Sequence, residues 1–495
     1  PGPGRRRLFA HSRRAGLKVA EQAYRGATAV TDLGPALQAL VREILSSRER
    51  HAGAPVFEAV SPDAIRDRLT ASFDFEHPID LGRLQADVGD LLKRWTVDVT
   101  HPAYFGLFNP PVDPAGIVAD ALVALYNPQL AAWSHAPAAN EIERLTLDYL
   151  GSLLWPESDS TVGSFTSGGA EANLSAVIVA LTSQFPEFGV HGVRALPGAP
   201  RMYASEESHH SLLKIAHFTG IGREALHIVP TDPDLRLDAE ALERAIERDL
   251  EAGALPFLVV GTAGTTSAGI IDPLPELAGV CERHGLWLHV DAAWGGTACV
   301  SPRLRSSLAG IDAADSVTWD AHKWLSVPMG AGMFFCRHPE PVGRAFRAST
   351  GYMPGDTTGA VDPYSTTVQW SRRFTGLKVF MTLARLGRQQ LVERIERQAE
   401  IGNLLRAGLE QDGWEIVNQT PLPVVCFRRP EMTDPELHGG LLSFLYERGR
   451  VWISKVDLPA IGPALRACIS SYVSGPAELD LLRSELRLGL AHMGD

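Results

Sequence analysis

Residues 160–340 predict an α/β fold, in which helices cover both faces of a mostly parallel seven-stranded sheet. Two observations predict it. Short apolar runs alternate with amphipathic segments, as in parallel strands joined by crossover helices. In one such segment, 238–251, Leu242, Ile246 and Leu250 recur at helical spacing, and 274–284 is a second candidate helix. The candidate strands are 163–166, 201–205, 225–229, 257–262, 287–291, 316–319 and 332–336.

The flanking sequence predicts two further parts. Before the sheet, helical patterns cover 34–50, 62–73, 81–97 and 114–125. After it, residues 343–371 are rich in Gly, Thr, Ser, Pro and Asp and predict a long loop. Helices are then expected at 374–409, 435–448 and 477–492, and strands at 424–428, 451–454 and 466–470. We therefore expect an N-terminal helical segment (1–100), a large domain (101–385) and a small C-terminal α+β domain (386–495).

Composition excludes several classes of protein. The 495 residues are 45% hydrophobic and carry a formal charge of −12 without a basic face, so a nucleic-acid partner is not expected. Arg5, Arg6 and Arg7 are interpreted as a solvated terminus. No apolar run approaches the roughly 20 residues of a membrane span, and none has the form of a secretory signal. The five cysteines lack metal-binding or disulfide spacing, which favours free thiols in a cytoplasmic protein.

Lys323 lies just beyond the end of a predicted core strand, between His322 and Trp324. Ligands of open α/β sheets bind at the carboxyl ends of strands. A lysine there is partly desolvated, and its amine becomes nucleophilic enough to form a Schiff base. The ordinary alternative is a lysine whose stem packs while its ammonium group reaches water.

Asp291 ends another predicted strand, and small residues follow it. A buried carboxylate needs a cationic or hydrogen-bonding partner, and the N–H of a pyridinium ring would supply one. The alternative is that Asp291 caps the next helix.

Gly168, Gly169 and Ala170 join the strand at 163–166 to an Ala-rich helix. Free N–H groups at a helix start bind anions, and glycines allow close approach. The segment lacks the lysine of a triphosphate-binding loop, and an ordinary tight turn fits it equally well.

His209 follows the strand at 201–205, and Thr266 follows the strand at 257–262. The neighbouring His209 and His210 project in different directions without ligand spacing, so no metal is expected. His209 is instead a candidate for stacking on a ring, and Thr266 supplies a hydroxyl, although a polar turn also explains Thr266. These motifs all lie at one edge of the predicted sheet. They supply an anion-binding turn, a ring that can stack on a cofactor, a carboxylate, a hydroxyl and an amine. Together they fit a phosphorylated, aromatic, basic cofactor that carries an aldehyde.

With these parts in place, residues 95–475 resemble the group II decarboxylases of fold type I. These enzymes use pyridoxal 5'-phosphate (PLP) and include aromatic-amino-acid, glutamate, cysteine-sulfinate and diaminobutyrate decarboxylases. Besides the residues above, the resemblance rests on His101-Pro102 with Phe105, Trp133 to Pro137 with Glu141 and Glu143, and Arg372-Arg373-Phe374 with Leu377-Lys378.

The resemblance implies a role for each site residue. Lys323 holds PLP as a Schiff base, Asp291 pairs with the pyridine nitrogen, and His209 stacks on the ring. The phosphate is expected at Gly168, Gly169 and Ala170, with Thr266 and His322 near the cofactor. Asp320 stands where many members have Asn, and the stretch 327–332 is less polar than is common in the family.

Tyr352, in the loop at 343–371, matches a family tyrosine that protonates the substrate carbon once the loop closes, and His209 is the alternative proton donor. In the family, Phe at this position is associated with aldehyde formation, so Tyr352 favours formation of an amine.

The resemblance thus implies decarboxylation of an L-amino acid by a homodimer with its site at the subunit interface. Leu107, Phe108 and Trp133 suggest an apolar substrate wall, which favours an aromatic or aliphatic amino acid over glutamate. The sequence places no arginine plainly for an acidic side chain, and Arg372, Arg373 and Arg466 stay open as partners for one. Two alternatives stay open for the function. One is another PLP reaction, either transamination or oxidative decarboxylation-deamination to an aldehyde. The other is a catalytically silent binding protein.

Overall fold

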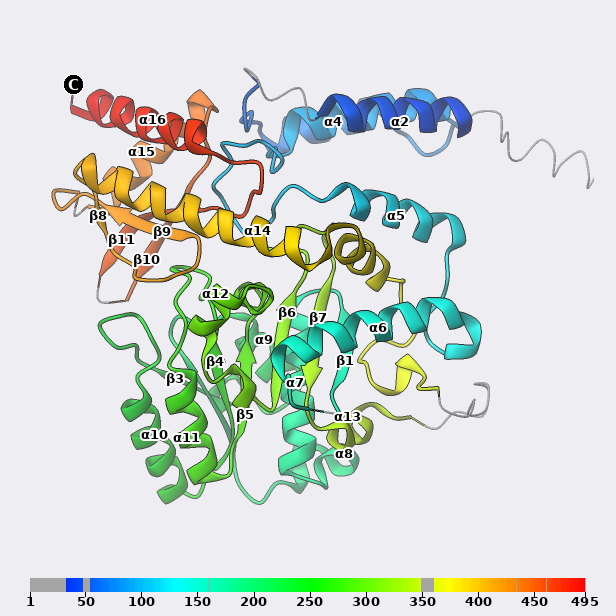
Figure 1. Ribbon diagram of the computed structural model, residues 1–495, viewed down its shortest axis with the longest axis vertical. Coiled ribbons are helices and arrows are strands. Elements are labelled where there is room, and N and C mark those ends of the chain that lie inside the picture. The colour runs from blue at the N-terminus through cyan, green and yellow to red at the C-terminus, as the bar shows by residue number, and fades with distance from the viewer. Residues whose placement is uncertain are drawn as a thin grey trace, which may run out of the picture. The chain divides into compact units, whose positions relative to one another are not determined.

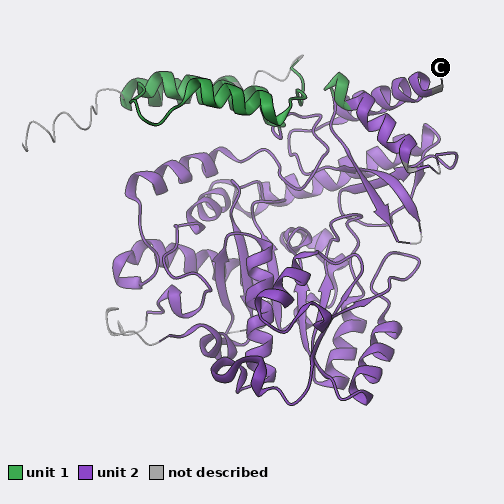
Figure 2. Ribbon diagram, turned by 180° about the vertical axis from the view of Figure 1, so that it is seen from behind, with its two compact units in different colours: residues 1–98, 446–450 green, residues 99–445, 451–495 purple. Residues whose placement is uncertain are grey.

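The computed structural model describes residues 33–47, 54–158, 160–348, 360–432, 434–459 and 461–494. The chain divides into two compact units, Pro1–Asp98 with Tyr446–Arg450, and Val99–Leu445 with Val451–Asp495 (Figure 2). The first unit contains the helices α2 (Leu33–Ser47), α3 (Pro62–Ser72) and α4 (Leu81–Trp95). Ser61 and Asp80 begin α3 and α4, because their side chains accept hydrogen bonds from N–H groups that have no partner within the helix.

The second unit is built on a seven-stranded sheet with the order β1-β7-β6-β5-β4-β2-β3 (Figure 1). Only β7 runs against its neighbours, so the other six strands end at one edge. This confirms the predicted mostly parallel α/β sheet. The strands are β1 (Val162–Thr166), β2 (Pro200–Ser205), β3 (Leu226–Val229), β4 (Leu255–Thr262), β5 (Trp287–Asp291), β6 (Ser316–Asp320) and β7 (Gly332–Cys336).

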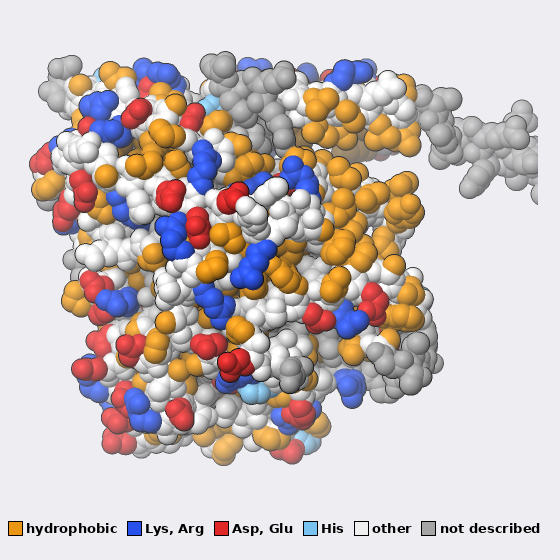
Figure 3. Space-filling view, in the orientation of Figure 1, with side chains coloured by type: hydrophobic (Ala, Val, Ile, Leu, Met, Phe, Trp, Pro, Cys, Tyr) orange, Lys and Arg blue, Asp and Glu red, His pale blue; other side chains and the backbone are white. Residues whose placement is uncertain are grey.

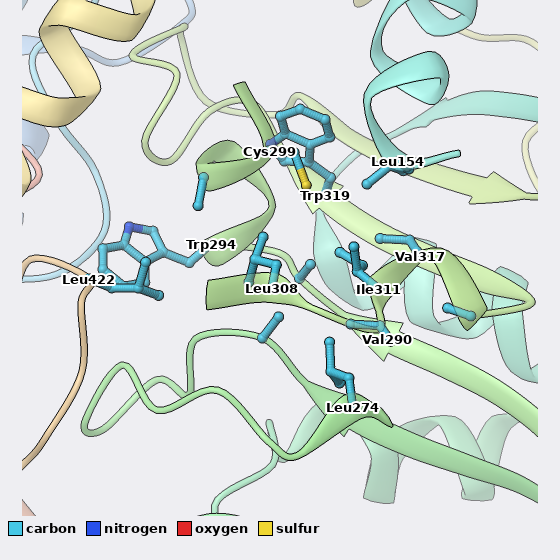
Figure 4. Close-up of a cluster of buried hydrophobic side chains, with 14 of the residues drawn as sticks. Leu154, Leu274, Val290, Trp294, Cys299, Leu308, Ile311, Val317, Trp319 and Leu422 are labelled. Carbon is cyan, nitrogen blue, oxygen red and sulfur yellow. The ribbon is translucent and has the colours of Figure 1, made fainter. Parts of the chain in front are cut away.

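Helices cover both faces of the sheet because its strands are apolar on both sides. Along β4, Leu258 and Val260 pack with α7 and α9, while Val259 between them packs with α10 and α11. The second face carries the larger core, which Figure 4 shows around Val290, Val317 and the indole rings of Trp294 and Trp319. The helices of this unit are α5 (Pro114–Tyr126), α6 (Pro137–Leu154), α7 (Gly169–Gln184), α8 (Phe188–His191), α9 (Ser211–Phe218), α10 (Ala239–Glu251), α11 (Leu274–His284), α12 (Pro302–Arg305), α13 (Pro339–Phe346), α14 (Gly376–Gln411), α15 (Pro435–Arg448) and α16 (Pro476–Gly494).

A second, antiparallel sheet has the order β10-β11-β9-β8, with β8 (Glu415–Ile416), β9 (Val424–Arg428), β10 (Ser454–Leu458) and β11 (Gly462–Cys468). The segment 103–107 is hydrogen-bonded beside it. Phe105 N–H donates to the carbonyl of Trp452, and Cys468 N–H donates to the carbonyl of Phe105. The helix α14 joins the two sheets and is broken at Gly387, whose φ of 62° lies outside the helical region.

Three local expectations differ from the structure. The strand expected at 451–454 begins at Ser454, and Trp452 makes only an isolated bridge to Tyr104. The helix α6 and the short strand β8 were not predicted. The loop expected at 343–371 begins later, because α13 continues to Phe346.

Candidate active site

A cavity of about 290 Å³ lies at the edge where the parallel strands of the large sheet end. Nine residues singled out in the sequence line it: Phe108, Gly168, Gly169, Ala170, His209, Thr266, Asp291, Asp320 and Lys323. Apart from Phe108, they come from segments that follow β1, β2, β4 and β6 and from the ends of β5 and β6. The other lining residues are Ser167, Glu171, Asn173, Thr262, Gly264, Ala293 and Trp294.

Lys323 points its amine into this cavity beside a buried carboxylate. Its Nζ lies 3.1 Å from Asp320 Oδ2, and the side chains are 23% and 2% exposed. The other oxygen, Asp320 Oδ1, is buried without a hydrogen-bond partner among the described residues. Lys323 Nζ also lies 5.7 Å from the centre of the Phe108 ring, within range of a cation–π contact.

His322 lies behind the same carboxylate and does not line the cavity. Its Nδ1 accepts a hydrogen bond from Ala331 N–H at 3.3 Å, and its Nε2 is 3.7 Å from Asp320 Oδ2. Burial lowers the pKa of His322, so the ring is neutral at physiological pH.

Asp291 is held by two hydrogen bonds at the end of β5. Asn173 Nδ2 donates to Oδ2 at 2.7 Å, and the Ala293 N–H donates to Oδ1 at 3.1 Å. Asn173 comes from the first turns of α7 and is itself buried. We did not identify Asn173 from the sequence, where it is one polar residue in an Ala-rich helix.

His209 presents a neutral ring to the cavity. Burial is the main cause of its lowered pKa. Its Nδ1 accepts a hydrogen bond from Ser211 N–H at 3.2 Å and lies 2.8 Å from Ser211 Oγ. The remaining ring hydrogen therefore resides on Nε2. Among the described residues, no group of three or more His, Cys, Asp or Glu is placed so that it could hold a metal ion.

The glycines at the start of α7 allow three segments to approach one another. A Cβ added to Gly169 would lie 2.9 Å from Asp320 Oδ2, and one added to Gly332 would lie 2.5 Å from the Cα of Gly168. The first N–H groups of α7 have no partner within the helix and carry the positive end of its dipole. This end of α7 is therefore suited to an anion.

Aromatic rings form the remaining wall of the cavity. Phe108 and Trp294 lie 4.7 Å apart between ring centres, and Trp294 stacks on Trp324 at 5.1 Å. Arg466 lies over Phe108, with its guanidinium carbon 4.8 Å from the ring centre. Arg466 is 2% exposed, and its Nη2 has no hydrogen-bond partner among the described residues.

The remaining candidates lie elsewhere. Tyr352 is outside the described residues. Trp133 lines a separate cavity of about 410 Å³ beside α6, so its expected place in the substrate wall is wrong. Leu107 is 54% exposed and does not line the site. Arg372 and Arg373 do not line it either, and they pair with Glu143 and Asp120.

The site thus combines an amine, a buried carboxylate, a neutral flat ring and an anion-binding helix start in one cavity. These groups match the aldehyde, ring nitrogen, ring face and phosphate of PLP. In addition, Trp294 Nε1 is a buried hydrogen-bond donor without a partner among the described residues. The residues therefore fit the cofactor, and the fold and site define a PLP-dependent α/β enzyme.

Comparison with known proteins agrees with this class. A family model described as the pyridoxal-dependent decarboxylase conserved domain matches residues 62–429. The chain is 30% identical over 415 residues to aromatic-L-amino-acid decarboxylase of Bacillus atrophaeus, covering 82% of this chain and 84% of that protein. It is 30% identical over 421 residues to human cysteine sulfinic acid decarboxylase, covering 80% and 84%. The crystal structure of Rhodiola rosea 4-hydroxyphenylacetaldehyde synthase has a TM-score of 0.84 and 26% identity, covering 94% of this chain and 99% of that chain.

The chain belongs to the pyridoxal-dependent decarboxylase family. It is a PLP-dependent decarboxylase with the fold type I architecture, and its cofactor is PLP.

Proposed function

We propose that this protein removes CO2 from an L-amino acid and releases the corresponding amine, with PLP bound to Lys323 as a Schiff base. The observation that carries the proposal is the cavity that Lys323 shares with Asp291 and the start of α7. These groups would hold the cofactor at its aldehyde, its ring nitrogen and its phosphate.

When bound, PLP supplies a ring that takes up the electrons left behind as CO2 departs. Asp291 would supply a negative charge at the ring nitrogen, and the neutral His209 would cover the ring face without adding positive charge. The N–H groups of Gly169 and Ala170 would bind the phosphate. Lys323 accepts and returns protons as substrate enters and amine leaves. Tyr352 donates the proton to the substrate carbon, a step that needs water to be excluded.

The aromatic wall of the cavity is the surface that would contact the side chain of the substrate. Phe108 and Trp294 offer an apolar surface in the cavity, while Arg466, which does not line the cavity, lies over Phe108 with its Nη2 buried and without a hydrogen-bond partner among the described residues. The Arg466→Met variant separates the contribution of the guanidinium group to substrate preference from that of the apolar surface. For an acidic substrate we expect kcat/KM to fall about 100-fold, because a hydrogen bond to a charged group contributes about 1.5–3 kcal/mol. For an apolar substrate kcat/KM would stay within a few-fold.

Formation of an aldehyde is the second candidate reaction, because one solved relative is named an aldehyde synthase. A panel of aromatic, aliphatic and acidic L-amino acids, assayed for CO2, amine, aldehyde and hydrogen peroxide, distinguishes the two. We expect CO2 and amine in equal amounts. Detection of aldehyde and hydrogen peroxide in place of the amine would contradict our proposal and support the alternative reaction.

We also propose a cytoplasmic homodimer. Large apolar side chains are exposed on α5, where Leu125 is 73% and Tyr126 76% exposed, and Figure 3 shows hydrophobic side chains gathered over this helix. Such patches favour association with another surface. All five cysteines are free and buried, which suits a reducing compartment. Among the described residues, no helix is long and apolar enough to cross a membrane. Sedimentation of the Tyr126→Asp variant tests the dimer, which this charge should weaken.

The covalent attachment is tested by borohydride reduction followed by peptide mass spectrometry. We expect the phosphopyridoxyl group on Lys323, and Lys323→Ala should lose both this adduct and the visible absorbance of the bound cofactor. Lys378→Arg is the matched control, because Lys378 is also buried and burial lowers its pKa, yet its Nζ donates to the Met329 carbonyl outside this cavity. A normal adduct and normal turnover in Lys323→Ala would refute the proposal.

A further inference from the structure

A row of polar side chains runs behind Asp291 on the α7 face of the sheet. Side chains two residues apart share a face of a strand, so Trp287, His289 and Asp291 project from β5 in one row. Ser316 and Thr318 project from β6 beside them, paired with His289 and Asp291. The side chains of these residues are almost completely buried.

Hydrogen bonds connect this row to the active-site carboxylate. Asn173 Nδ2 donates to Asp291 Oδ2 at 2.7 Å, which turns Asn173 Oδ1 toward the strands. That oxygen accepts from Thr318 Oγ1 at 2.6 Å and lies 3.1 Å from His289 Nε2.

The network assigns the direction of each bond. Asn173 Oδ1 can only accept, so His289 carries its hydrogen on Nε2 and donates it to Asn173. The opposite nitrogen, Nδ1, lies 2.9 Å from Ser316 Oγ and 3.1 Å from the Ser316 carbonyl oxygen, and of these two only the hydroxyl can donate to the neutral ring. Ser316 Oγ already accepts from Trp287 Nε1 at 2.9 Å, so its own hydrogen is free to be donated to His289.

The hydrogen-bond donors therefore all point the same way, from Trp287 through Ser316, His289 and Asn173 to Asp291. Chains aligned in this way strengthen one another, and donors aimed at a carboxylate favour its charged form. His289 takes part as a neutral ring, because burial lowers its pKa.

We propose that Asn173 and His289 are positioning residues that keep Asp291 ionised, so that the proton shared with the cofactor stays on the ring nitrogen. This inference rests on the proposed role of Asp291. A hydrogen bond to a charged group shifts such an equilibrium about tenfold to hundredfold. Without the Asn173 amide, the proton would move toward Asp291 and the ring would withdraw electrons less strongly.

The test uses holoenzyme loaded with PLP that carries ¹⁵N in the ring, and it reads the ¹⁵N chemical shift by NMR. We expect a protonated-nitrogen shift in the wild type and a displacement toward the unprotonated value in Asn173→Leu. His289→Leu should move in the same direction by less. In Asn173→Leu kcat should fall about tenfold or more with KM nearly constant. His289→Gln, which keeps an N–H donor, should restore most of the shift lost in His289→Leu.

Trp319→Phe is the matched control. It removes another buried indole hydrogen bond of the sheet, to Thr297, that does not lead to Asp291, so the ¹⁵N shift should stay at the wild-type value. An unchanged shift in Asn173→Leu would overturn the inference. An unprotonated ring in the wild type would instead overturn the role of Asp291 itself, and failure of the wild type to bind PLP would overturn the proposed function.

Discussion

Asp320 is the residue for which the resemblance leads us to expect Asn in many family members, and its replacement by Asn is a direct test of the local electrostatics. The carboxylate pairs with Lys323 at 3.1 Å and lies against Gly169, where the phosphate is expected. Cofactor binding must therefore break an ion pair and bring a second anion toward Asp320. Asn keeps the shape of the side chain and removes both obstacles.

The structure gives the size of the effect. An ion pair with a hydrogen bond contributes about 1.5–3 kcal/mol, and 1.4 kcal/mol is a factor of ten in affinity. We expect the dissociation constant of PLP from Asp320→Asn to fall about 10- to 100-fold, measured by titrating apoprotein with PLP and following absorbance. Asp312→Asn removes an exposed charge from the same unit and should leave the affinity unchanged. Equal or weaker binding of PLP by Asp320→Asn would refute this reasoning.

Two further predictions concern buried carboxylates. Glu143 and Arg372 form a two-point ion pair with both side chains 4% exposed, so Glu143→Gln should lower the free energy of unfolding by about 3–5 kcal/mol in urea titrations. Glu141→Gln, at an exposed and solvent-screened pair on the same helix, should leave the free energy of unfolding almost unchanged, and equal losses in the two variants would contradict the argument. Burial raises the pKa of Glu207 to about 7, above the roughly 4.3 of a glutamate in an unfolded chain. The folded protein therefore holds the proton more tightly than the unfolded chain does. The stability that protonated Glu207 provides is lost as the pH rises from about 4.3 to about 7. Glu207→Gln should therefore be more stable than the wild type by about 1–3 kcal/mol at pH 8 and equal to it near pH 4, and a pH-independent difference would contradict this sign.

The sequence predicted the seven strands of the large sheet because their signal is local. Each is a short apolar run bounded by turn residues, and five polar motifs follow directly at the strand ends. Parallel strands bring those ends together, so Lys323, Asp291 and His209 could be placed in one site before the structure was known. Their catalytic roles remain predictions.

Features that depend on distant segments were not predictable in this way. Asn173 becomes informative only when α7 packs on β5 and β6 and brings its amide to Asp291. Arg466 packs over Phe108 of the site from β11, so its position depends on the small sheet. Trp133 was misplaced for the same reason, since an aromatic side chain alone does not reveal which cavity it lines.

The segment 103–107 has a consequence for how the protein is synthesised. Its backbone partners are Trp452 and Cys468, and Arg466 donates to the Gly106 carbonyl from 360 residues further along the chain. At about 5–20 residues per second, a ribosome needs roughly 20 to 70 seconds to make those partners. Throughout that interval Phe105, fully buried in the folded protein, lacks the two backbone partners that hold it there. The hydrogen bonds that hold this segment, which directly precedes Phe108 of the active-site wall, can therefore form only after the small sheet has been translated.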